Sequence, residues 1–378
     1  MAEKTLGIGL VGTKFMGRAH SNAWMSAPRF FDLPREVLMR AVAGRDVADV
    51  AAFSRRWGWQ CCTDDWRDLL DDPQVSLVDV CTPNHVHAEV SIAALEAGRH
   101  VACEKPLAGT IADARAMRDA ARKAARKGVR TFVWFNYRRC PAVALAHQLV
   151  KEGRLGRIFH VRASYLQDWG GPSTPLLWRF QGKLAGSGAH GDLNAHLVDL
   201  TRALTGLEFD AVCGLQQTFT KERPDGAGGK AKVDVDDAFC FLAKFKGGAI
   251  GTYEATRVAP GRKNHNCIEI SGAKGSLRWN LERMNELEFF SFADGRDTQG
   301  FRTVMVMDGV HPYAANWWPD GHIVGYEHTF VHHVVDFVRA LHDGSPFAPD
   351  FDDGVAVQAV LDAALASAKS GKWVKVPK

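Results

Sequence analysis

The stretch that decides the fold is Leu6-Gly7-Ile8-Gly9-Leu10-Val11, followed at once by Gly12-Thr13-Lys14-Phe15-Met16-Gly17. The apolar run predicts a buried strand, and the segment from Met16 to Ser26 predicts a helix. A glycine turn between a first strand and a first helix is typical of dinucleotide-binding sheets, where the backbone closely approaches a pyrophosphate. The usual fingerprint has three glycines, and here Lys14 occupies the middle position. We therefore expect a dinucleotide site in which the Lys14 ammonium meets a phosphate.

The rest of the first 135 residues alternates apolar runs with helical stretches. Glycines stand just past three expected helices, at Gly58, Gly98 and Gly128, where a left-handed residue normally ends a helix. Continuously apolar strands separated by helices indicate a parallel sheet covered on both faces. The sequence therefore predicts an α/β fold whose N-terminal domain is a doubly wound parallel sheet of the Rossmann type. Its further strands are expected at Leu38–Ala43, Leu77–Cys81, Arg99–Cys103 and Arg130–Phe135, and its further helices from Val47 towards Gly58, at Val86–Ala97 and at Ile111–Lys127.

The rhythm of the sequence changes after Pro141. Apolar and polar residues alternate in stretches such as Phe159–Tyr165 and Phe239–Phe245, which is typical of antiparallel strands with one covered face. We expect one domain at residues 1–139 and a second, α+β domain at residues 140–378. The glycine- and charge-rich residues 222–234 are expected to form a surface loop. The helices of this part are expected near Ala142–Glu152, Gly191–Leu204, Thr329–His342 and Asp353–Ser370.

Composition excludes several classes of protein. The chain has 378 residues and a net charge of +4, which is too small to predict nucleic-acid binding. Its eight cysteines form no Cys-x-x-Cys pair, so neither a zinc ribbon nor a disulfide framework is expected. His328 and His332 are four residues apart, but no set of carboxylates accompanies them, and no metal is expected. No apolar stretch approaches the roughly 18 residues of a membrane span, and no signal peptide is recognisable. We expect a soluble cytoplasmic protein with no membrane partner.

The end of the second strand bears on which dinucleotide is bound. An acidic side chain at that point would bind the ribose 2′-hydroxyl of NAD, whereas an arginine accommodates the 2′-phosphate of NADP. This chain has Gly44-Arg45-Asp46 there. Arg45 favours NADP, and Asp46 could restore a preference for NAD. The sequence therefore leaves the choice open between NAD and NADP.

Two polar loops follow neighbouring strands of the predicted sheet. Thr82-Pro83-Asn84 follows the strand that ends at Cys81, and Glu104-Lys105-Pro106 follows the strand that ends at Cys103. Both loops belong to the carboxyl edge of the sheet, where ligands of open α/β sheets bind. In the second domain, Asp192 and His196 stand four residues apart at the start of an expected helix, so both project from one helical face.

These side chains suit the oxidation of an alcohol. That reaction needs a hydride acceptor, which a nicotinamide supplies, and a base for the hydroxyl proton. Burial beside a positively charged nicotinamide ring favours the neutral, basic form of a lysine such as Lys105. A histidine titrates at about 6.5, so His196 could share or relay the proton, and Asp192 could orient a hydroxyl group or the imidazole. We therefore predict Lys105, Asp192 and His196 as catalytic residues.

With these pieces in place, the chain resembles the glucose–fructose oxidoreductase/inositol dehydrogenase/rhizopine-catabolism (Gfo/Idh/MocA) family over essentially its whole length. The resemblance implies a Rossmann domain followed by a domain built on a large, mostly antiparallel sheet, which in such enzymes commonly mediates homodimers or homotetramers. It also implies that the family's lysine, aspartate and histidine correspond to Lys105, Asp192 and His196. The matching pieces are the glycine turn continuing to His20, Thr82-Pro83-Asn84 with His87, Glu104-Lys105-Pro106, and Asp192 with His196. The residues that we expect to contact the cofactor are Gly12, Lys14, Phe15, Met16, Gly17, Arg45, Thr82, Pro83, Asn84, His87, Glu104 and Lys105.

Within the family, the closer likeness is to members such as levoglucosan dehydrogenase and the glycoside 3-dehydrogenases. It rests on residues 135–139, 165–169, 178–180, 185–189, 233–237, 254–257 and 311–313. It implies oxidation of the 3-hydroxyl of a pyranose, with Trp169 and Trp178 stacking on a sugar face unless they pack in the core. The side chains expected to bind the hydroxyl groups of the substrate are Tyr137, Gln167, Arg179, Asp192 and His196. The aromatic stretch 317–328, which contains His322, could cap the substrate.

Three functions compete at this stage. The first is a reversible NAD(P)-dependent dehydrogenase that oxidises a secondary hydroxyl, with the 3-hydroxyl preferred, of a sugar, glycoside or cyclitol. The second is an NAD-dependent glycosidase that acts through transient 3-keto oxidation and elimination, and its additional base near carbon 2 could be His190, Tyr137 or Asp168. The third is a non-catalytic sensor of dinucleotides, which the complete set of catalytic residues disfavours. The particular sugar and the direction of the reaction stay open.

Overall fold

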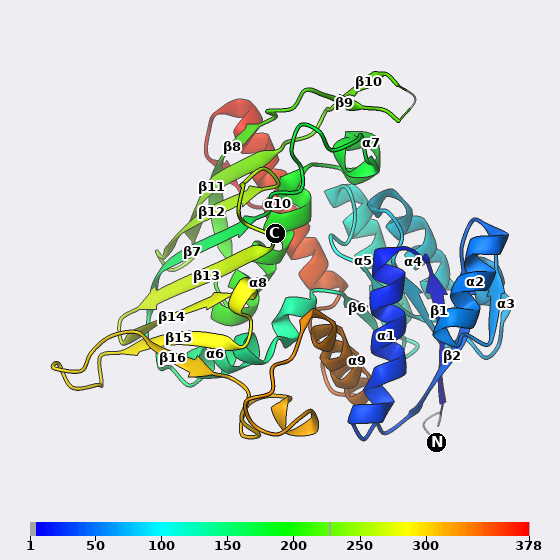
Figure 1. Cartoon of the computed structure of the whole chain (residues 1–378), viewed down its shortest axis with the longest axis horizontal. Coiled ribbons are helices and arrows are strands. Elements are labelled where there is room, and N and C mark those ends of the chain that lie inside the picture. Colours follow the sequence, from blue (N-terminus) through cyan, green and yellow to red (C-terminus); the bar gives the residue numbers. More distant parts are fainter. Residues whose placement is uncertain (1–4, 227, 378) are drawn as a thin grey trace. The chain divides into compact units, whose positions relative to one another are not determined.

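The computed structural model describes residues 5–226 and 228–377 (Figure 1). The chain divides into two compact units. The first consists of the residues up to Arg139 together with Gly325–Val355, and the second of Cys140–Val324 together with the residues from Ala356 onward.

The first unit is built on a six-stranded parallel sheet with the strand order β3-β2-β1-β4-β5-β6. The central strand β1 is buried along almost its whole length, as its apolar sequence requires. The strand order reverses between β1 and β4, which pair in parallel, and ligands of such sheets bind in front of that reversal. The predicted doubly wound sheet is confirmed. Its strands are β1 (Thr5–Val11), β2 (Glu36–Ala43), β3 (Cys61–Thr63), β4 (Leu77–Val80), β5 (His100–Cys103) and β6 (Thr131–Val133).

Helices cover this sheet, and α1 packs against α9 while α4 packs against α5. Helix α1 runs to Phe30, beyond the expected end at Ser26. Pro28 lies in its last turns and is tolerated there, since the proline lacks one backbone N–H donor. Gly58 ends α2 in the left-handed conformation with φ of 74°. The helices of this unit are α1 (Phe15–Phe30), α2 (Val47–Trp57), α3 (Asp68–Asp71), α4 (His87–Glu96), α5 (Ile111–Ala125) and α9 (Tyr326–Asp343).

Residues 325–355, which the sequence places in the second domain, pack within the first unit. The reason is the apolar face of α9. Phe330 lies 5.6 Å from Trp134 and Phe337 lies 4.4 Å from Phe132, measured between ring centroids. All four rings are buried, so the first unit completes its core with a helix from the far end of the sequence.

The second unit is built on a nine-stranded sheet with the order β16-β15-β14-β13-β7-β12-β11-β8-β17. Every neighbouring pair is antiparallel except β7 with β12. The large, mostly antiparallel sheet that the resemblance implies is confirmed. The strands are β7 (Ile158–Leu166), β8 (Phe209–Gln217), β11 (Ala238–Phe245), β12 (Ile250–Thr256), β13 (His265–Gly272), β14 (Gly275–Asn280), β15 (Glu286–Ser291), β16 (Arg302–Met305) and β17 (Val374–Lys375).

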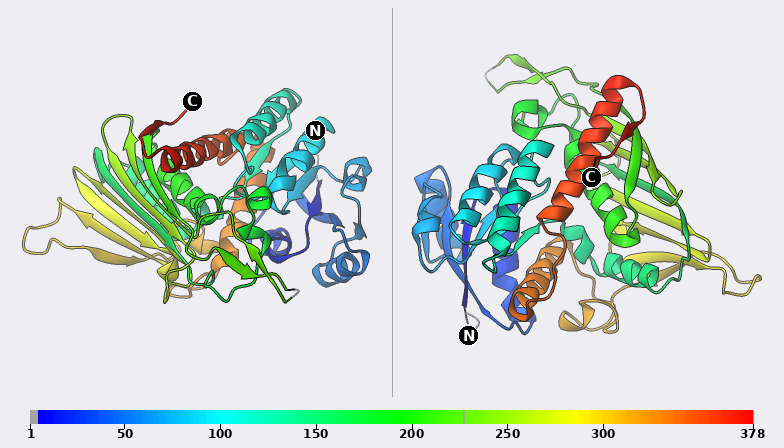
Figure 2. Two further views of the ribbon diagram at one scale, coloured as in Figure 1. Left: turned by 90° about the horizontal axis from the view of Figure 1, so that it is seen from above. Right: turned by 180° about the vertical axis from the view of Figure 1, so that it is seen from behind.

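Among the described residues, the helices of this unit lie on one face of the sheet (Figure 2). In β11, the side chains of Phe239, Phe241, Ala243 and Phe245 are buried while those between them are exposed. This alternation is the pattern of a strand with one face on the core and one in solvent. The helices of this unit are α6 (Pro141–Lys151), α7 (Gly182–Ala185), α8 (Ala195–Thr205) and the part of α10 (Phe351–Ser370) from Ala356 onward.

One local expectation was wrong. Residues 222–234 are not only a surface loop, because β9 (Glu222–Pro224) and β10 (Lys230–Lys232) pair there as a small antiparallel hairpin. The helix expected near Gly191–Leu204 is present, and it begins as a π-helical turn, η4 (His190–Asn194), before it becomes regular in α8. The remaining short helical turns are η1 (Asn84–Val86), η2 (Asn136–Arg139), η3 (Trp178–Phe180), η5 (Leu281–Arg283) and η6 (Ala314–Asn316).

Candidate active site

The turn between β1 and α1 has the shape of a phosphate-binding cradle. Gly12 has φ of +113°, and a Cβ atom on it would lie 2.8 Å from the carbonyl oxygen of Cys81. A Cβ atom on Gly17 would lie 2.2 Å from the carbonyl oxygen of Gly12. Both positions therefore require glycine, the first for the tight turn and the second for the contact of helix with strand. The residues present fit a bound dinucleotide.

The charged residues around this turn include one ion pair, one helix cap and one exposed arginine. The ammonium of Lys14 lies 3.1 Å from Asp49, and its side chain is 86% exposed. Asp46 caps α2, because its Oδ1 accepts a hydrogen bond of 2.8 Å from the backbone N–H of Asp49. Arg45 is exposed. Asp46, which could have favoured NAD by binding a ribose hydroxyl, is thus engaged as a helix cap.

The other expected cofactor residues of the glycine turn lie at its surface. The ring of Phe15 is 55% exposed and stacks on Tyr326 at a centroid distance of 6.2 Å. Met16 is half-buried. Tyr137, in η2, also reaches this neighbourhood, since its ring lies 6.2 Å from that of Tyr326 and is almost fully buried.

His87 connects the two loops at the carboxyl edge of the sheet. Its Nε2 lies 2.9 Å from the carbonyl oxygen of Thr82, and its Nδ1 lies 3.1 Å from that of Pro106. The ring is fully buried, and burial lowers the pKa of His87 below its usual value although these carbonyl groups raise it. His87 therefore holds the Thr82-Pro83-Asn84 loop beside the loop that carries Lys105.

Glu104 points to the interior of the first unit, whereas Lys105 is half-buried. One carboxylate oxygen of Glu104 accepts a hydrogen bond of 3.1 Å from the backbone N–H of Lys105. The other lies 3.1 Å from Nε2 of His20. Glu104 thus stabilises the turn from the interior of the unit, and of these two side chains only that of Lys105 is partly exposed.

In the second unit, Asp192 is paired with an arginine that the sequence analysis did not single out as a site residue. The guanidinium of Arg257 lies 2.9 Å from Asp192 and donates a second hydrogen bond of 3.1 Å to the carbonyl oxygen of Arg179. It also lies 5.2 Å from the ring centroid of Trp169. The Arg257 side chain is only 1% exposed. One buried cation therefore brings together three of the residues predicted to hold the substrate.

A chain of hydrogen bonds organises the neighbouring side chains of this unit. The indole N–H of Trp169 donates to Gln167 at 2.6 Å, and the amide of Gln167 donates to Asn264 at 2.8 Å. The hydroxyl of Tyr165 donates to the same oxygen of Asn264 at 2.8 Å. The ring of Tyr165 lies 5.7 Å from that of His196. Gln167 therefore orients Trp169, and Tyr165 places His196 in the same polar region.

No sequence motif assigns a role to Tyr165 or Asn264 individually. Tyr165 lies on β7, and Asn264 lies just before β13. The antiparallel register of these strands places Tyr165 opposite Asn266. The only signal in the sequence was the polar composition of the stretch around Tyr165. The pairing of strands that makes the contact cannot be read from either segment alone.

The remaining predicted substrate residues, and Trp169 again, have local contacts of their own. Trp178 lies in η3, and the Arg179 guanidinium lies 4.5 Å from its ring centroid. Trp169 packs against the buried cluster of Phe180, Val233 and Val235. His322 is exposed and lies 2.8 Å through Nδ1 from the carbonyl oxygen of Pro319.

Two of the three candidate bases of the glycosidase alternative, His190 and Asp168, are engaged in contacts of their own. His190 stacks on Phe239 at 3.8 Å, its Nε2 donates to the carbonyl oxygen of Leu361 and its Nδ1 accepts from Asn194. Burial lowers the pKa of His190 although the charge of Asp236 raises it. Asp168 is paired with Lys263 at 2.6 Å, and this hydrogen bond lowers the pKa of Asp168.

Within residues 5–226 and 228–377, no three or more His, Cys, Asp or Glu side chains gather in a way that could hold a metal ion. His332 is bonded instead to the carbonyl oxygen of Arg139 at 2.8 Å. Among these residues, no helix has the length and hydropathy needed to cross a bilayer.

The strand order, the glycine cradle and the two supported loops define a dinucleotide-binding oxidoreductase fold. Residues 6–133 match the family model for the oxidoreductase family with an NAD-binding Rossmann fold, and residues 143–278 match that for the GFO/IDH/MocA C-terminal domain. The chain belongs to the Gfo/Idh/MocA family of oxidoreductases, and its first unit is an NAD-binding domain.

Relatives match the chain from end to end. Levoglucosan dehydrogenase of Pseudarthrobacter phenanthrenivorans is 43% identical over 390 residues, which cover 99% of each chain. The crystal structure of an oxidoreductase domain protein from Kribbella flavida is 52% identical, covers 100% of both chains and has a TM-score of 0.97. A structure of levoglucosan dehydrogenase in complex with NADH and levoglucosan is 44% identical, covers 99% of both chains and has a TM-score of 0.95.

Proposed function

We propose that the protein is an NAD(P)-dependent dehydrogenase that reversibly oxidises a secondary hydroxyl, preferably the 3-hydroxyl, of a sugar, glycoside or cyclitol. The observation that carries this proposal is the full-length similarity to levoglucosan dehydrogenase, together with the presence of Lys105, Asp192 and His196 in this chain. The buried Arg257 fixes Asp192, and the partly exposed indole of Trp169 beside it suits stacking against a carbohydrate.

In the proposed mechanism, a bound nicotinamide dinucleotide supplies the hydride acceptor. The chain itself handles the proton. Lys105 accepts the hydroxyl proton of the substrate, and His196 shares or relays it. Asp192 stays a charged acceptor beside Arg257 and orients a substrate hydroxyl. The cofactor is expected to rest on Gly12, Lys14 and Gly17 and against the Thr82-Pro83-Asn84 loop.

The decisive experiment pairs a substitution with an account of the cofactor. Lys105→Met is expected to lower kcat by about 100- to 10,000-fold, the usual contribution of general acid–base catalysis. The matched control is Lys127→Met, because Lys127 is exposed beyond the end of α5. Turnover is followed with a panel of sugars, glycosides and inositols by the formation of reduced nicotinamide. Unchanged turnover in Lys105→Met would contradict the proposal.

The same assay separates dehydrogenase from glycosidase. A dehydrogenase forms one reduced cofactor for each substrate oxidised, whereas a glycosidase that uses the cofactor transiently releases an aglycone without net reduction. The buried His190 and the paired Asp168 offer little support for the additional base that the glycosidase needs. Release of an aglycone with only catalytic amounts of NAD would favour the glycosidase.

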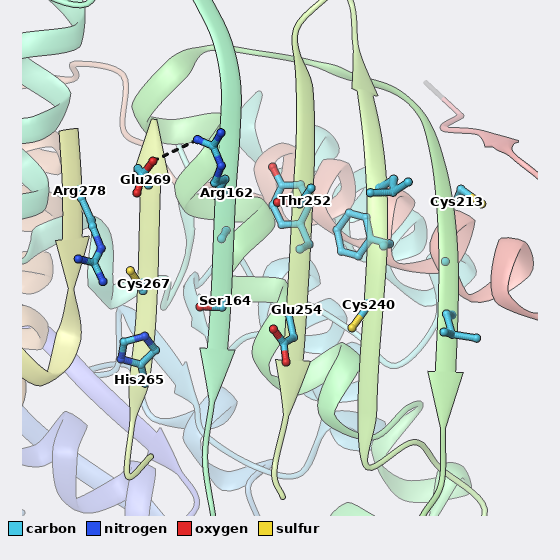
Figure 3. Close-up of a pocket in the computed structure, with 16 residues that line it drawn as sticks. Arg162, Ser164, Cys213, Cys240, Thr252, Glu254, His265, Cys267, Glu269 and Arg278 are labelled. Atoms are coloured by element: carbon cyan, nitrogen blue, oxygen red, sulfur yellow. Dashed lines mark hydrogen bonds and ion pairs between the residues drawn. The ribbon is translucent and has the colours of Figure 1, made fainter. Parts of the chain in front are cut away.

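We also propose that a second copy of the chain covers the open face of the nine-stranded sheet. Leu215, Leu242 and Ile250 project from this face and are 71%, 51% and 53% exposed. Leu215 and Leu242 line a hollow whose lining also includes Arg162, Glu254, Glu269 and Arg278 from four neighbouring strands (Figure 3). Apolar side chains interleaved with both signs of charge suit a self-complementary contact between two copies.

Light scattering of the full chain after size exclusion tests this surface. The wild type is expected to be a dimer or tetramer, and Leu242→Glu is expected to shift it towards the monomer because a carboxylate would be buried without a partner. Phe292→Glu, at an exposed apolar residue outside the hollow, is the control. A monomeric wild type would contradict the proposal.

We further propose that the protein works in the cytoplasm. All eight cysteines are free, and Cys62 and Cys240 are exposed, which suits a reducing compartment. Cell fractionation tests this location.

A further inference from the structure

His20 lies in α1 at the centre of a buried array of charged groups. The side chains of His20 and Asp79 are both 0% exposed, and that of Glu104 is 7% exposed. Nδ1 of His20 lies 3.1 Å from Asp79, and Nε2 lies 3.1 Å from Glu104. The imidazole also packs on Trp134 at a centroid distance of 4.2 Å. The mechanism proposed above assigns no role to His20, although the residue belongs to the stretch that opens the chain.

Asp79 fixes one side of the array. It accepts hydrogen bonds from the indole N–H groups of Trp24 at 2.7 Å and Trp134 at 2.8 Å, in addition to that from His20. A carboxyl group surrounded by three N–H donors acts as the acceptor-only carboxylate. His20 Nδ1 therefore carries a proton and donates a hydrogen bond to Asp79.

The other ring nitrogen faces a second carboxyl group, so one more proton lies between Nε2 and Glu104. Burial lowers the pKa of His20, but the charge and hydrogen bond of Asp79 and the contacts with Cys81 and Glu104 raise it, and the net pKa lies well above the usual value. The other titratable group that faces His20 is His333 of α9, which burial keeps neutral by lowering its pKa. The proton is therefore on His20, and Glu104 is the acceptor.

Glu104 transmits this arrangement to the predicted base. Its first oxygen accepts from His20, and its second accepts from the backbone N–H of Lys105 at 3.1 Å. A carboxylate that is held at both oxygens has one orientation rather than several. The contacts thus run without a gap from the two indoles through Asp79, His20 and Glu104 to the backbone of Lys105.

We propose that His20 is a positioning residue that acts through Glu104 to fix the turn carrying Lys105. This inference rests on the proposed function, because it assigns His20 to the same reaction. The inference depends on one structural link: the hydrogen bond from the Lys105 N–H to Glu104 persists while His20 holds Glu104 in place.

Two substitutions separate the two sides of the imidazole. In His20→Asn the amide nitrogen falls near the position of Nδ1 and can still donate to Asp79, but the side chain at position 20 no longer reaches Glu104. In His20→Gln the amide nitrogen falls near Nε2 and can still donate to Glu104. Both variants lose one of two buried hydrogen bonds, so they are matched controls for loss of stability.

The first readout is hydrogen exchange at the Lys105 amide, followed by NMR in protein labelled with [15N]lysine. Release of Glu104 removes a charge-assisted bond, so His20→Asn is expected to speed exchange at Lys105 by about tenfold or more, and His20→Gln much less. The second readout is kcat, which is expected to fall by about 10- to 100-fold in His20→Asn, as when a reacting group is displaced by a fraction of an ångström to an ångström. His20→Gln is expected to keep most of the wild-type kcat.

Equal Lys105 exchange in the two variants, or equal loss of kcat in both in proportion to their melting temperatures, would overturn the inference. If His20→Asn does not fold, Glu104→Asp replaces it, because the shorter side chain cannot span His20 and the Lys105 N–H together. Unchanged Lys105 exchange in Glu104→Asp would overturn the inference equally. Failure of the proposed function is recognised separately, since Lys105→Met would then keep its turnover whatever the exchange shows.

Discussion

Arg257 is the residue on which the polar region of the second unit depends. Its guanidinium is buried, and it contacts Asp192, the carbonyl oxygen of Arg179 and the face of Trp169. These contacts come from three separate segments of the chain. A planar, forked cation can serve several acceptors at once, whereas a lysine ammonium is a point charge.

Arg257→Lys is therefore expected to lower kcat/KM by about 10- to 100-fold, because the ammonium keeps the charge but not both hydrogen bonds. The measurement is a double-mutant cycle with Asp192→Asn, in which the two losses should be less than additive because the residues share one contact. Arg262→Lys, at a half-exposed arginine nearby in the sequence, should behave as the wild type. Additive losses would show that Arg257 does not act through Asp192.

Arg45 bears on the choice between NAD and NADP. We expect its exposed side chain to meet the 2′-phosphate of NADP, since one carboxylate oxygen of Asp46 caps α2. Arg45→Ala is expected to weaken NADP binding by about tenfold or more through loss of a charge-assisted hydrogen bond, and to change NAD binding little. Isothermal titration calorimetry measures both affinities, with Arg55→Ala at the far end of α2 as control. Equal effects on the two cofactors would remove Arg45 from the choice between them.

Among the elements, the β9–β10 hairpin has a larger structural role than its sequence indicates. Arg223 is fully buried, forms an ion pair of 3.2 Å with Asp237 and lies 3.8 Å from the ring centroid of Phe180. Its guanidinium also donates to the carbonyl oxygens of Gly170 and Gly171, at 2.7 Å each. The hairpin thus holds the segment that carries Trp169 and Arg179.

Arg223→Met is expected to destabilise the protein by about 3–5 kcal/mol, because Asp237 would stay buried without its cation. The free energy of unfolding in urea measures this loss. Adding Asp237→Asn should recover part of it, since the remaining buried group is then neutral. No recovery in the double variant would mean that the arginine acts by packing on Phe180 rather than by its charge.

Most strands and helices of the parallel sheet could be predicted, because the strands are continuous apolar runs and a glycine follows three of the helices. The short β3 and α3, of three and four residues, show no such pattern and were not predicted. The β9–β10 hairpin could not be predicted, because its two strands have three residues each and lie among the glycines and lysines of residues 222–234, which are typical of a loop. For the candidate site, Lys105, Asp192 and His196 stand in recognisable motifs, and their roles stay predictions. Arg257, Tyr165 and Asn264 acquire their contacts only when strands distant in sequence pair in register, and no local pattern encodes that register.

At the scale of the whole molecule, buried histidines give stability a definite dependence on pH. The pKa of His100 is lowered to about 4 by burial and by the charges of Arg35 and Arg130. The pKa of His332 is lowered to about 3, mainly by burial, although its hydrogen bond to the carbonyl oxygen of Arg139 raises it. Nδ1 of His100 accepts a hydrogen bond from the N–H of Arg130, which requires the neutral ring. In the unfolded chain both would take up a proton near their reference pKa of about 6.5.

The unfolded state therefore binds more protons than the native state below about pH 6.5, and the stability present above that pH is lost as pH falls towards 4 and 3. His20 has the opposite sign. Its native pKa is raised, so its contribution is complete below about pH 6.5 and is lost as pH rises through the native value. Urea unfolding at a series of pH values should show that the free energy of unfolding falls at both acid and alkaline pH. His100→Gln should weaken the acid limb only, and an unchanged acid limb would contradict this assignment.

The ring of His20 lies 4.2 Å from the indole of Trp134, whose N–H is bound to Asp79. A protonated imidazole accepts an electron from a photoexcited indole, so Trp134 should be nearly dark for as long as His20 holds its second proton. Light emitted by Trp134, isolated as the difference from a Trp134→Phe protein, would then brighten when the proton leaves. The fluorescence of Trp134 therefore reports the protonation state of His20 within the first unit.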